Sequence, residues 1–406
     1  MSKTAHRVSR TIERLHQLAE IGRVEGLQGT TRPGLGCREQ RACELVAEWM
    51  REAGLDVGWD AYGNLFGTLP GSQPDAGEVW SGSHLDTVPD GGSFDGALGV
   101  LCSLEAVAAN GPRPATQRVV VFRDEEGWRF GRGCFGSRAV CGRLADGELE
   151  ALDAGGVSVG EAVAALAIEP GGAPGGLPAS YVELHVEQGP ELERQGLALG
   201  EVSAIAGMAG FTIEFTGSAG HAGTVPMPAR RDALTAAAEF VLAIRDAALR
   251  IPGAVATIGE LRITGPATNV IPGRVALSLD LRAPAAEQLS SLAGAVPAIA
   301  DGAAMAAGCA VTATATWRLA PVAMSDRVRA AIRDAAAAAG HPIAVLPSGA
   351  GHDAGILAAA GVEAGMLLVR SRNGGASHRP DELTDEADIA AATEVLIATL
   401  ATLTRC

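Results

Sequence analysis

The sequence lacks three features that would each point to a particular class of protein. Positive charge is scarce, since 32 lysines and arginines face 47 acidic residues, and the net charge of −15 argues against a nucleic acid or an anionic membrane as partner. The seven cysteines include no CxxC pair and are odd in number, so we expect neither a disulfide framework nor a thiolate metal site. No apolar run reaches the length of a membrane span, and charges interrupt the N-terminal segment, which predicts a cytoplasmic protein without a signal peptide. These absences leave a small molecule as the expected partner.

The length of 406 residues exceeds what one hydrophobic core usually supports, and it predicts two domains. Alanine-rich amphipathic stretches alternate with apolar runs that carry β-branched residues, which is typical of α/β layering around a mixed central sheet. Helices are expected at 38–52 and 97–109, and strands at 64–69, 78–84 and 117–123. The segment 155–178 is rich in glycine, alanine and proline, which predicts a linker or a surface excursion.

The pattern of predicted strands and helices changes near residue 210. Strands are expected at 211–216, 254–264, 274–282 and 310–317, with helices at 232–248 and 286–307. Two strand–helix–strand halves of this kind predict a small ferredoxin-like α+β sheet with helices on one face. Because the polar motifs described next lie on both sides of it, we expect 210–318 to be inserted into a catalytic domain formed by 1–209 and 319–406.

Five short segments place histidines and carboxylates beside glycines in otherwise apolar surroundings. They read GSHLDTVPDGGSFDG (82–96), DEEGWRFG (124–131), HVEQG (185–189), GHAGT (220–224) and GGASHRP (374–380). Three imidazoles and two carboxylates from these segments form the ligand set that a pair of borderline divalent ions such as zinc or manganese prefers: His84, Asp95, Glu126, His185 and His378. HLD and EE both follow predicted strands, and open α/β sheets bind ligands at the carboxyl ends of strands. The pattern predicts a two-metal hydrolase.

The individual motifs predict distinct roles at such a site. Asp86, two residues after His84, can accept a hydrogen bond from the ring nitrogen that faces away from the metal. Asp95 follows a Gly-Gly turn and can bridge two ions. Of the adjacent glutamates, we predict Glu126 as a ligand and Glu125 as the general base that takes the proton of the attacking water. A single HxD motif or a solvated EE pair often carries no function, but three acids directly after a buried strand favour a site.

The chain resembles the M20 metallopeptidase-related amidohydrolases, in particular the branch of N-carbamoyl-L-amino-acid hydrolases, β-ureidopropionases and allantoate amidohydrolases. The motifs that carry the resemblance occur in the expected order from about residue 11 to the C-terminus: GSHLDTVPDGGSFDGALGVL, EEGWRFGRGCFGSRA, HVEQGP, GHAGTVPM, RRDAL, TNVIPG, GAGHDA and SHRPDE. In the wider family the fourth ligand is usually an acid, whereas His185 resembles the carbamoyl-hydrolase branch. The resemblance implies that His84 and His185 hold one ion, that Glu126 and His378 hold the other, and that Asp95 bridges both.

The resemblance also implies a substrate clamp. Gln188, Asn269 and Arg282 would grip the carboxylate end of the substrate, and His221 would stabilise the oxyanion. The residues alone support Arg282, because a guanidinium at a strand end can bind a carboxylate with two hydrogen bonds, but a surface salt bridge is the alternative. Without the resemblance, Asn269 would be a turn residue and His221 structural.

The glycine-rich GAGHDA motif supplies the remaining predicted site residues. We expect Gly351 and His352 to contact the ureido end of the substrate, and Asp353 to cap the following helix. Gly355 stands where relatives often have glutamine, and Arg370 where they often have proline. Both positions are expected near the substrate end of the site.

The implied activity is that of a metal-dependent amidohydrolase that cleaves a linear C–N bond, above all the carbamoyl group of an N-carbamoyl-L-amino acid. Two zinc, manganese, cobalt or nickel ions would serve it, and the inserted domain would join a homodimer and close over the site as a lid. Allantoate amidohydrolase and β-ureidopropionase are alternatives that share every predicted residue. An M20-type dipeptidase or aminoacylase is disfavoured by His185, and a non-catalytic small-molecule-binding homologue is disfavoured by the complete ligand set and Glu125.

Overall fold

The computed structural model describes residues 3–405, which divide into two compact units. The first unit contains the described residues up to Ser203, together with Ala323–Leu346 and the residues from Ala350 onward. The second unit is Ala204–Val322 with Pro347–Gly349. That the second unit acts as a lid or a dimerisation domain stays a prediction.

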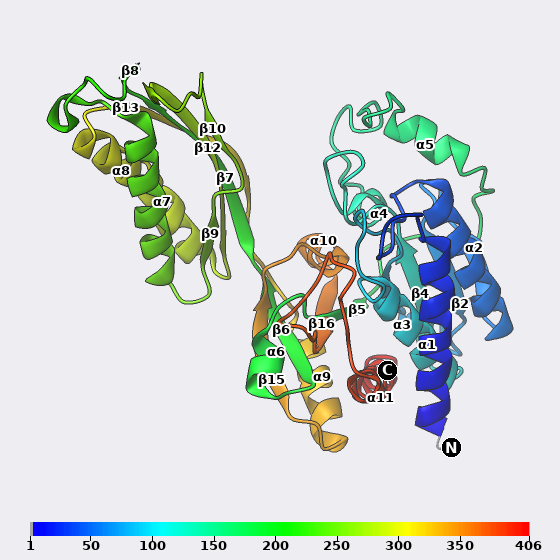
Figure 1. Ribbon diagram of the computed structural model, residues 1–406. Helices are drawn as coiled ribbons and strands as arrows, with labels where there is room; N and C mark the ends of the chain where they lie inside the picture. The colour runs from blue at the N-terminus through cyan, green and yellow to red at the C-terminus, as the bar shows by residue number, and fades with distance from the viewer. Residues whose placement is uncertain (1–2, 406) are drawn as a thin grey trace. The chain divides into compact units, whose positions relative to one another are not determined.

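A nine-stranded mixed sheet forms the centre of the first unit (Figure 1). Its strand order is β1-β2-β4-β3-β5-β16-β6-β14, with β15 beside β6. The neighbours β4–β3, β3–β5 and β5–β16 are parallel, whereas β1–β2, β2–β4 and β6–β16 are antiparallel. The strands are β1 (Asp56–Trp59), β2 (Leu65–Leu69), β3 (Glu78–His84), β4 (Thr116–Phe122), β5 (Ser180–Val186), β6 (Leu199–Ile205), β14 (Val322–Ala323), β15 (Ile343–Ser348) and β16 (Glu363–Val369).

Side chains alternate along the central strands, and the alternation decides what each face of the sheet carries. In β5, Val182 and Leu184 belong to the main hydrophobic core, whereas the intervening Glu183 and His185 point to the opposite face. Five helices contribute buried side chains to that core: α1 (Lys3–Ile21), α2 (Cys37–Glu52), α3 (Ala97–Asn110), α9 (Asp326–Ala338) and α11 (Glu386–Leu403). The opposite face of β5 therefore carries the polar Glu183 and His185, beside the buried ring of Tyr181.

Short helices and loops cover this second face. Glu183 accepts a hydrogen bond from the Ala354 backbone N–H at the start of α10, which places α10 on the polar side of the sheet. Helices α10 and α4 contact each other. The elements outside the main core are η1 (Pro74–Ala76), α4 (Phe135–Val140), α5 (Val159–Ala165), α6 (Glu191–Gln195) and α10 (Asp353–Ala359).

The segment 155–178 was expected to be a linker or a surface excursion; it contains helix α5, so the linker alternative was wrong. Helix α5 begins with a capping box, in which Ser158 and Glu161 each bond the other's backbone N–H. Its apolar side packs with Leu35 and Phe135 in a small separate core. The Ser-x-x-Glu pattern was the local signal, but the surrounding glycines and prolines outweighed it.

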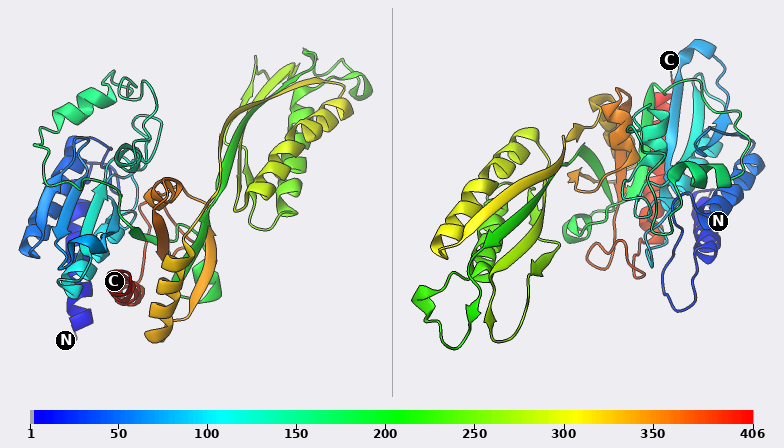
Figure 2. Two further views of the ribbon diagram at one scale, coloured as in Figure 1. Left: turned by 180° about the vertical axis from the view of Figure 1, so that it is seen from behind. Right: turned by 90° about the horizontal axis from the view of Figure 1, so that it is seen from above.

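The second unit is an antiparallel sheet with two helices on one face, as both views in Figure 2 show. Its strand order is β10-β12-β7-β13, and β9 also pairs with β12. Two strand–helix–strand halves build it, since α7 follows β7 and α8 connects β12 to β13. The elements are β7 (Gly207–Thr216), β8 (Gly220–His221), η2 (Met227–Ala229), α7 (Ala233–Leu249), β9 (Val255–Thr257), β10 (Leu261–Ile263), β11 (Val270–Ile271), β12 (Arg274–Ala283), α8 (Ala286–Ala306) and β13 (Ala310–Leu319).

Two expectations for this unit need correction. The single strand expected at 254–264 is interrupted, because Glu260 bonds Ser278 between the paired segments β9 and β10. Helix α8 is long and apolar enough by length and composition to cross a membrane, so the expectation that no segment reaches that length was wrong on this measure. In the structure, Leu289, Leu292 and Val296 of α8 are buried in the core of the second unit.

Candidate metal centre

The predicted ligands of the first unit meet where its parallel strands end. His84 is the last residue of β3, His185 lies near the end of β5, and Glu126 follows β4. Because β3, β4 and β5 are parallel, their carboxyl ends share one edge of the sheet. Asp95 lies two residues before α3, next to Gly96, whose φ is +62°. A Cβ at Gly96 would lie 2.5 Å from the His84 ring, so only glycine lets Asp95 approach this closely.

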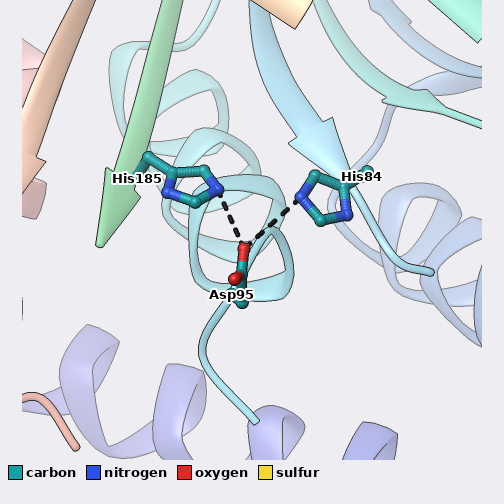
Figure 3. A group of neighbouring side chains, drawn as sticks. All are labelled: His84, Asp95 and His185. Carbon is teal, nitrogen blue, oxygen red and sulfur yellow. Dashed lines mark ion pairs between the residues drawn. The ribbon is translucent and has the colours of Figure 1, made fainter. Parts of the chain in front are cut away.

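Three of these residues form a buried cluster (Figure 3). The Asp95 Oδ1 atom lies 3.0 Å from His185 Nε2 and 3.5 Å from His84 Nε2. The ligand atoms of the three side chains all lie within 4.8 Å of one another. Two imidazoles and a carboxylate oxygen thus converge in the manner of a divalent-metal site.

The other oxygen of Asp95 faces a second cluster. Its Oδ2 atom lies 3.4 Å from His378 Nε2, which in turn lies 3.2 Å from Glu126 Oε2. The His378 side chain is 48% exposed, so this cluster is open to solvent on one side. Catalytic metal sites keep such an open position for water and substrate. The structure therefore brings all five predicted ligands together, with Asp95 between two groups.

Unpartnered polar atoms show that these residues fit a cation. Glu126 Oε1 is buried without a hydrogen-bond partner in the described part of the chain, and His185 Nε2, whose near neighbour is Asp95 Oδ1 at 3.0 Å, is buried without a well-aligned hydrogen bond. Asp86, Asp95 and Glu125 are also buried nearby. Burying several carboxylates is costly unless cations compensate them, and divalent ions would satisfy both the charge and the unpartnered atoms.

Electrostatics link the protonation of the ligands to one another. Burial raises the pKa of Glu125 well above its usual range, and the pKa of Glu126 to about 7. Burial would also raise the pKa of Asp95, but the His185, His378 and His84 imidazoles outweigh it and hold that pKa well below its usual range. The hydrogen bond to Asp95 raises the pKa of His378 to about 9. Imidazoles must be neutral to coordinate, so ion binding would release protons here.

Asp86 organises more of the site than its predicted contact with His84. Its two carboxylate oxygens accept the backbone N–H groups of Glu125 at 3.0 Å and Glu126 at 3.1 Å. The ring Nδ1 of His84 lies 3.1 Å from the backbone oxygen of Asp86 and 3.4 Å from its carboxylate. The carboxylate thus holds the two glutamates, and the backbone carbonyl is the nearer acceptor for the imidazole.

A buried ion pair anchors the same segment from behind. Arg123 Nη1 donates to Glu39 Oε2 at 3.1 Å, and both side chains are fully buried. The Glu39 carboxylate also accepts the backbone N–H groups of Leu35 at 2.7 Å and Asp124 at 3.2 Å. Helix α2 therefore fixes the end of β4 from which Glu125 and Glu126 project.

Replacing Glu39 with alanine should lower the free energy of unfolding by about 3–5 kcal/mol, because it removes the negative charge that is hydrogen-bonded to the buried Arg123 guanidinium. Urea unfolding monitored by circular dichroism measures the change. Glu48→Ala is the matched control, since Glu48 lies on an exposed position of the same helix. A loss for Glu39→Ala no larger than that of the control would show that the pair does not anchor the segment.

Gln188, which was predicted to bind the substrate carboxylate, lies at the site and contacts the predicted ligand Asp95. Its Nε2 donates to Asp95 Oδ2 at 2.9 Å, and the Ser377 hydroxyl donates to the same oxygen at 3.1 Å. Gln188 has a φ of +57°, an uncommon conformation for a residue other than glycine. Ser377 was missed in the sequence, although it directly precedes His378.

The GAGHDA motif also reaches the site. The His352 ring is buried and lies 4.6 Å from the His185 ring, with Gly351 directly before it. The predicted capping role of Asp353 was wrong, because His352 occupies the N-cap position of α10 and Asp353 is already inside the helix. Burial and the neighbouring Glu183 raise the pKa of Asp353 to about 8.

One buried acid at this site escaped the sequence reasoning. Glu183 is fully buried, accepts the Ser83 hydroxyl at 2.8 Å, and groups with His185 and His352. A charged residue in the apolar strand YVELHV, two positions before a predicted ligand, was the available signal.

Arg370 and Gly355, the two positions where the sequence differs from many relatives, both take part in the packing of helices here. Arg370 donates to both oxygens of Asp388 in α11, at 2.8 and 3.0 Å, so its guanidinium is committed to that helix. Gly355 is buried within α10. That both positions lie near the substrate end of the site stays a prediction.

The three predicted clamp residues of the second unit fall into two places. Asn269 and His221 are neighbours, since Ala222 N–H donates to the Asn269 carbonyl and His221 pairs with Val270. Asn269 lies just before Arg274, the first residue of β12. Arg282 pairs with Met208, near the other end of the same strand. Eight residues of strand separate the two ends by about 26 Å. Within one chain, Asn269 and Arg282 therefore do not meet.

A mixed sheet that ends in imidazoles and carboxylates around one shared acid, with a further glutamate beside them, defines a metal-dependent hydrolase. Sequence comparison narrows this class, because residues 80–402 match peptidase family M20/M25/M40, and the chain belongs to that family. Its members are metal-dependent enzymes. The family predicted from the motifs is confirmed.

Individual relatives match over nearly the whole chain. The N-carbamoyl-L-amino acid amidohydrolase of Geobacillus stearothermophilus is 41% identical over 397 residues, covering 96% of each chain. The probable allantoate deiminase of Oryza sativa subsp. japonica is 34% identical, over 95% of this chain and 87% of the relative. A solved amidase of the hydantoinase/carbamoylase family from Burkholderia multivorans has a TM-score of 0.91 at 32% identity, covering 98% of both chains. The predicted α/β fold class is confirmed.

Proposed function

We propose that the chain hydrolyses the carbamoyl group of an N-carbamoyl-L-amino acid, releasing the amino acid, ammonia and carbon dioxide. The observation that carries the proposal is Asp95, whose two oxygens face two clusters of ligands, with Glu125 buried beside them. The amidohydrolase relative that matches over 96% of the chain supports the substrate class. An allantoate amidohydrolase is the second candidate, supported by the deiminase relative.

The residues of the candidate site would have separate roles in metal binding and proton transfer. His84 and His185 would hold one divalent ion, Glu126 and His378 a second, and Asp95 both. Zinc, manganese, cobalt or nickel ions at this site would polarise the ureido carbonyl and lower the pKa of water. Glu125 would accept the proton of the attacking water and deliver it to the leaving nitrogen.

The position of the clamp residues supports a homodimer. One small substrate cannot contact both ends of β12, so we infer that His221 and Asn269 serve the site of a partner subunit. Arg282 Nη1 donates to the Gly349 carbonyl at 2.7 Å. Its Nε also donates to Asp280, so the substrate carboxylate would compete with that contact.

An unpaired strand edge supports association of the second units. Strand β13 lies at the edge of its sheet and carries Trp317 at 44% and Leu319 at 60% exposure. A ten-residue edge offers unsatisfied backbone groups to another strand, and a second copy of β13 would give a symmetric contact. Such a dimer would join the inserted segment 210–318 of two chains.

The absence of disulfides among the described cysteines supports a cytoplasmic enzyme. The six described cysteines are all free. A reducing compartment keeps thiols in this state.

A product assay tests the reaction itself. Purified protein, loaded with zinc, manganese, cobalt or nickel, is given N-carbamoyl-L-amino acids, ureidopropionate, allantoate, a dipeptide and an N-acetyl amino acid. We expect ammonia and amino acid in equal amounts from the carbamoyl substrates, with the highest kcat/KM. Faster release from allantoate would establish the second candidate, and turnover of only the dipeptide or acetyl substrate would reject both.

Complementation between inactive chains tests the shared site. Co-expression of Glu125→Gln and His221→Ala chains with different tags should restore roughly a quarter of wild-type activity, because half of random dimers are mixed and each has one intact site. The doubly tagged fraction contains only mixed dimers, so its activity per chain should be about half that of wild type, and assays of both the total and this fraction measure the effect. Activity no higher than that of either variant alone would place His221 on its own chain's site.

A further inference from the structure

The loop that carries His378 is tied to the loop that carries Asp95. Ser377, directly before His378, donates to the Asp95 side chain at 3.1 Å. His378 has a φ of +57°, an uncommon backbone conformation that its surroundings must hold in place. Residues some 280 positions apart thus meet at this point.

Glu382 makes the second tie, to the backbone. One of its carboxylate oxygens, Oε2, accepts the N–H groups of Phe94 at 2.8 Å and Asp95 at 3.1 Å. The side chain is only 6% exposed, and its other oxygen, Oε1, is buried without a hydrogen-bond partner among the described residues. A buried carboxylate beside another acid is unfavourable, so its presence here calls for a function.

The Asp95 loop is shaped to receive this carboxylate. A Cβ on Gly92 would lie 2.0 Å from Glu382 Oε2. Any other residue at this position would push the Glu382 carboxylate away from the Phe94 and Asp95 N–H groups. The glycine and the glutamate therefore work as one contact.

We propose that Glu382 is a positioning residue that sets the spacing between Asp95 and His378, and thereby the affinity for the ion held between them. This inference rests on the proposed two-metal function. Two of the three ligands of the first ion, His84 and His185, project from strands and do not depend on the tie, so that ion shares only Asp95 with the tied loop. The second ion depends on two loops, so it is the one that loses affinity when the tie is cut.

Zinc titration of four variants tests the proposal. Metal-free wild type and the variants Glu382→Ala, Glu382→Gln, Gly92→Ala and Glu386→Ala are dialysed against buffered zinc, and bound metal is measured per chain. Glu386 is exposed at the start of α11 and is the matched control. We expect Glu382→Ala and Gly92→Ala to bind the second ion 10–100-fold more weakly, as is typical when the residues that hold ligands are lost. The first ion, which keeps two ligands on strands, should lose less affinity than the second.

The glutamine variant separates positioning from folding. Its amide oxygen can still accept both N–H groups, so Glu382→Gln should bind both ions close to wild type. Unfolding measured in the presence of a chelator should give Glu382→Gln and Gly92→Ala similar free energies of unfolding. These two variants therefore still test the proposal if Glu382→Ala does not fold. Wild-type affinity for the second ion in Gly92→Ala, or equal weakening in Glu382→Gln and Glu382→Ala, would overturn the inference. A wild type that binds fewer than two ions would instead overturn the two-metal proposal.

Discussion

Replacing Glu125 with glutamine should abolish turnover while both metal ions stay bound. Glutamine has the shape of glutamate, but its amide cannot accept the proton of the attacking water. General base catalysis contributes roughly 10²–10⁴-fold, so kcat should fall by at least about two orders of magnitude. Measured kcat, together with metal analysis of the same preparation, separates loss of chemistry from loss of metal.

The geometry explains why this carboxylate is suited to proton transfer. Glu125 Oε2 lies 3.9 Å from His84 Nε2, while Oε1 lies 3.7 Å from the Cys134 thiol. One oxygen thus faces the ligand cluster, and the other faces a weak donor. Burial raises the pKa of Glu125 well above its usual range, and bound cations would favour its ionised form. A carboxylate on which burial and bound cations act in opposite directions can both take and return a proton.

The adjacent glutamate supplies a contrasting variant. Glu126→Gln makes the same chemical change one residue away, but Glu126 Oε2 lies 3.2 Å from His378 Nε2. It should weaken metal binding, and added zinc should partly restore its turnover. If Glu125→Gln lost metal and Glu126→Gln kept it, the two roles would have to be exchanged.

Local patterns were sufficient to predict most elements of the fold. The strand expected at 78–84 is β3, and the helix expected at 38–52 is α2 with one more residue at its start. Alternating apolar residues and amphipathic faces are visible within a few residues of sequence. The strand at 254–264 failed because its interruption depends on Ser278, whose hydroxyl and backbone belong to a neighbouring strand.

The candidate site was predictable for a different reason. Its ligands follow strands, and parallel strands bring their carboxyl ends together, so His84, Glu126 and His185 could be grouped from the order of elements. What holds them could not be predicted. Glu39 and Arg123 lie 84 positions apart, and Glu382 and Asp95 lie 287 apart, and neither contact follows from a local pattern.

The arrangement of the predicted clamp residues could not be inferred from the family resemblance alone. It implied that Asn269 and Arg282 act on one carboxylate, and nothing in the sequence separates them. The register of β12 places Arg282 opposite Met208 and Arg274 opposite Thr216, at the two ends of one pairing. Whether the clamp residues come from one chain or two was open from the sequence, and the register supplies the separation that bears on it.

Asp95→Asn should remove both ions and reduce turnover to background. The two Asp95 oxygens face different clusters, at 3.0 Å from His185 Nε2 and 3.4 Å from His378 Nε2. An asparagine has one acceptor oxygen and no charge, so whichever way its amide turns, one cluster faces an N–H donor. Metal content after dialysis against buffered zinc measures the effect, and zinc affinity should fall at least about 100-fold.

Thermal unfolding gives an independent measurement of the same change. Zinc at 100 times its Kd should stabilise the wild type by about 2.7 kcal/mol per site, whereas Asp95→Asn should gain little. Asp90→Asn is the matched control, because Asp90 lies in the same loop but accepts the backbone N–H groups of Gln28 and Gly29 instead. If Asp95→Asn bound two ions as tightly as this control, Asp95 would not be the shared ligand. The two histidine clusters would then have to bind their ions separately, and the proposed two-metal chemistry would lose the residue that joins them.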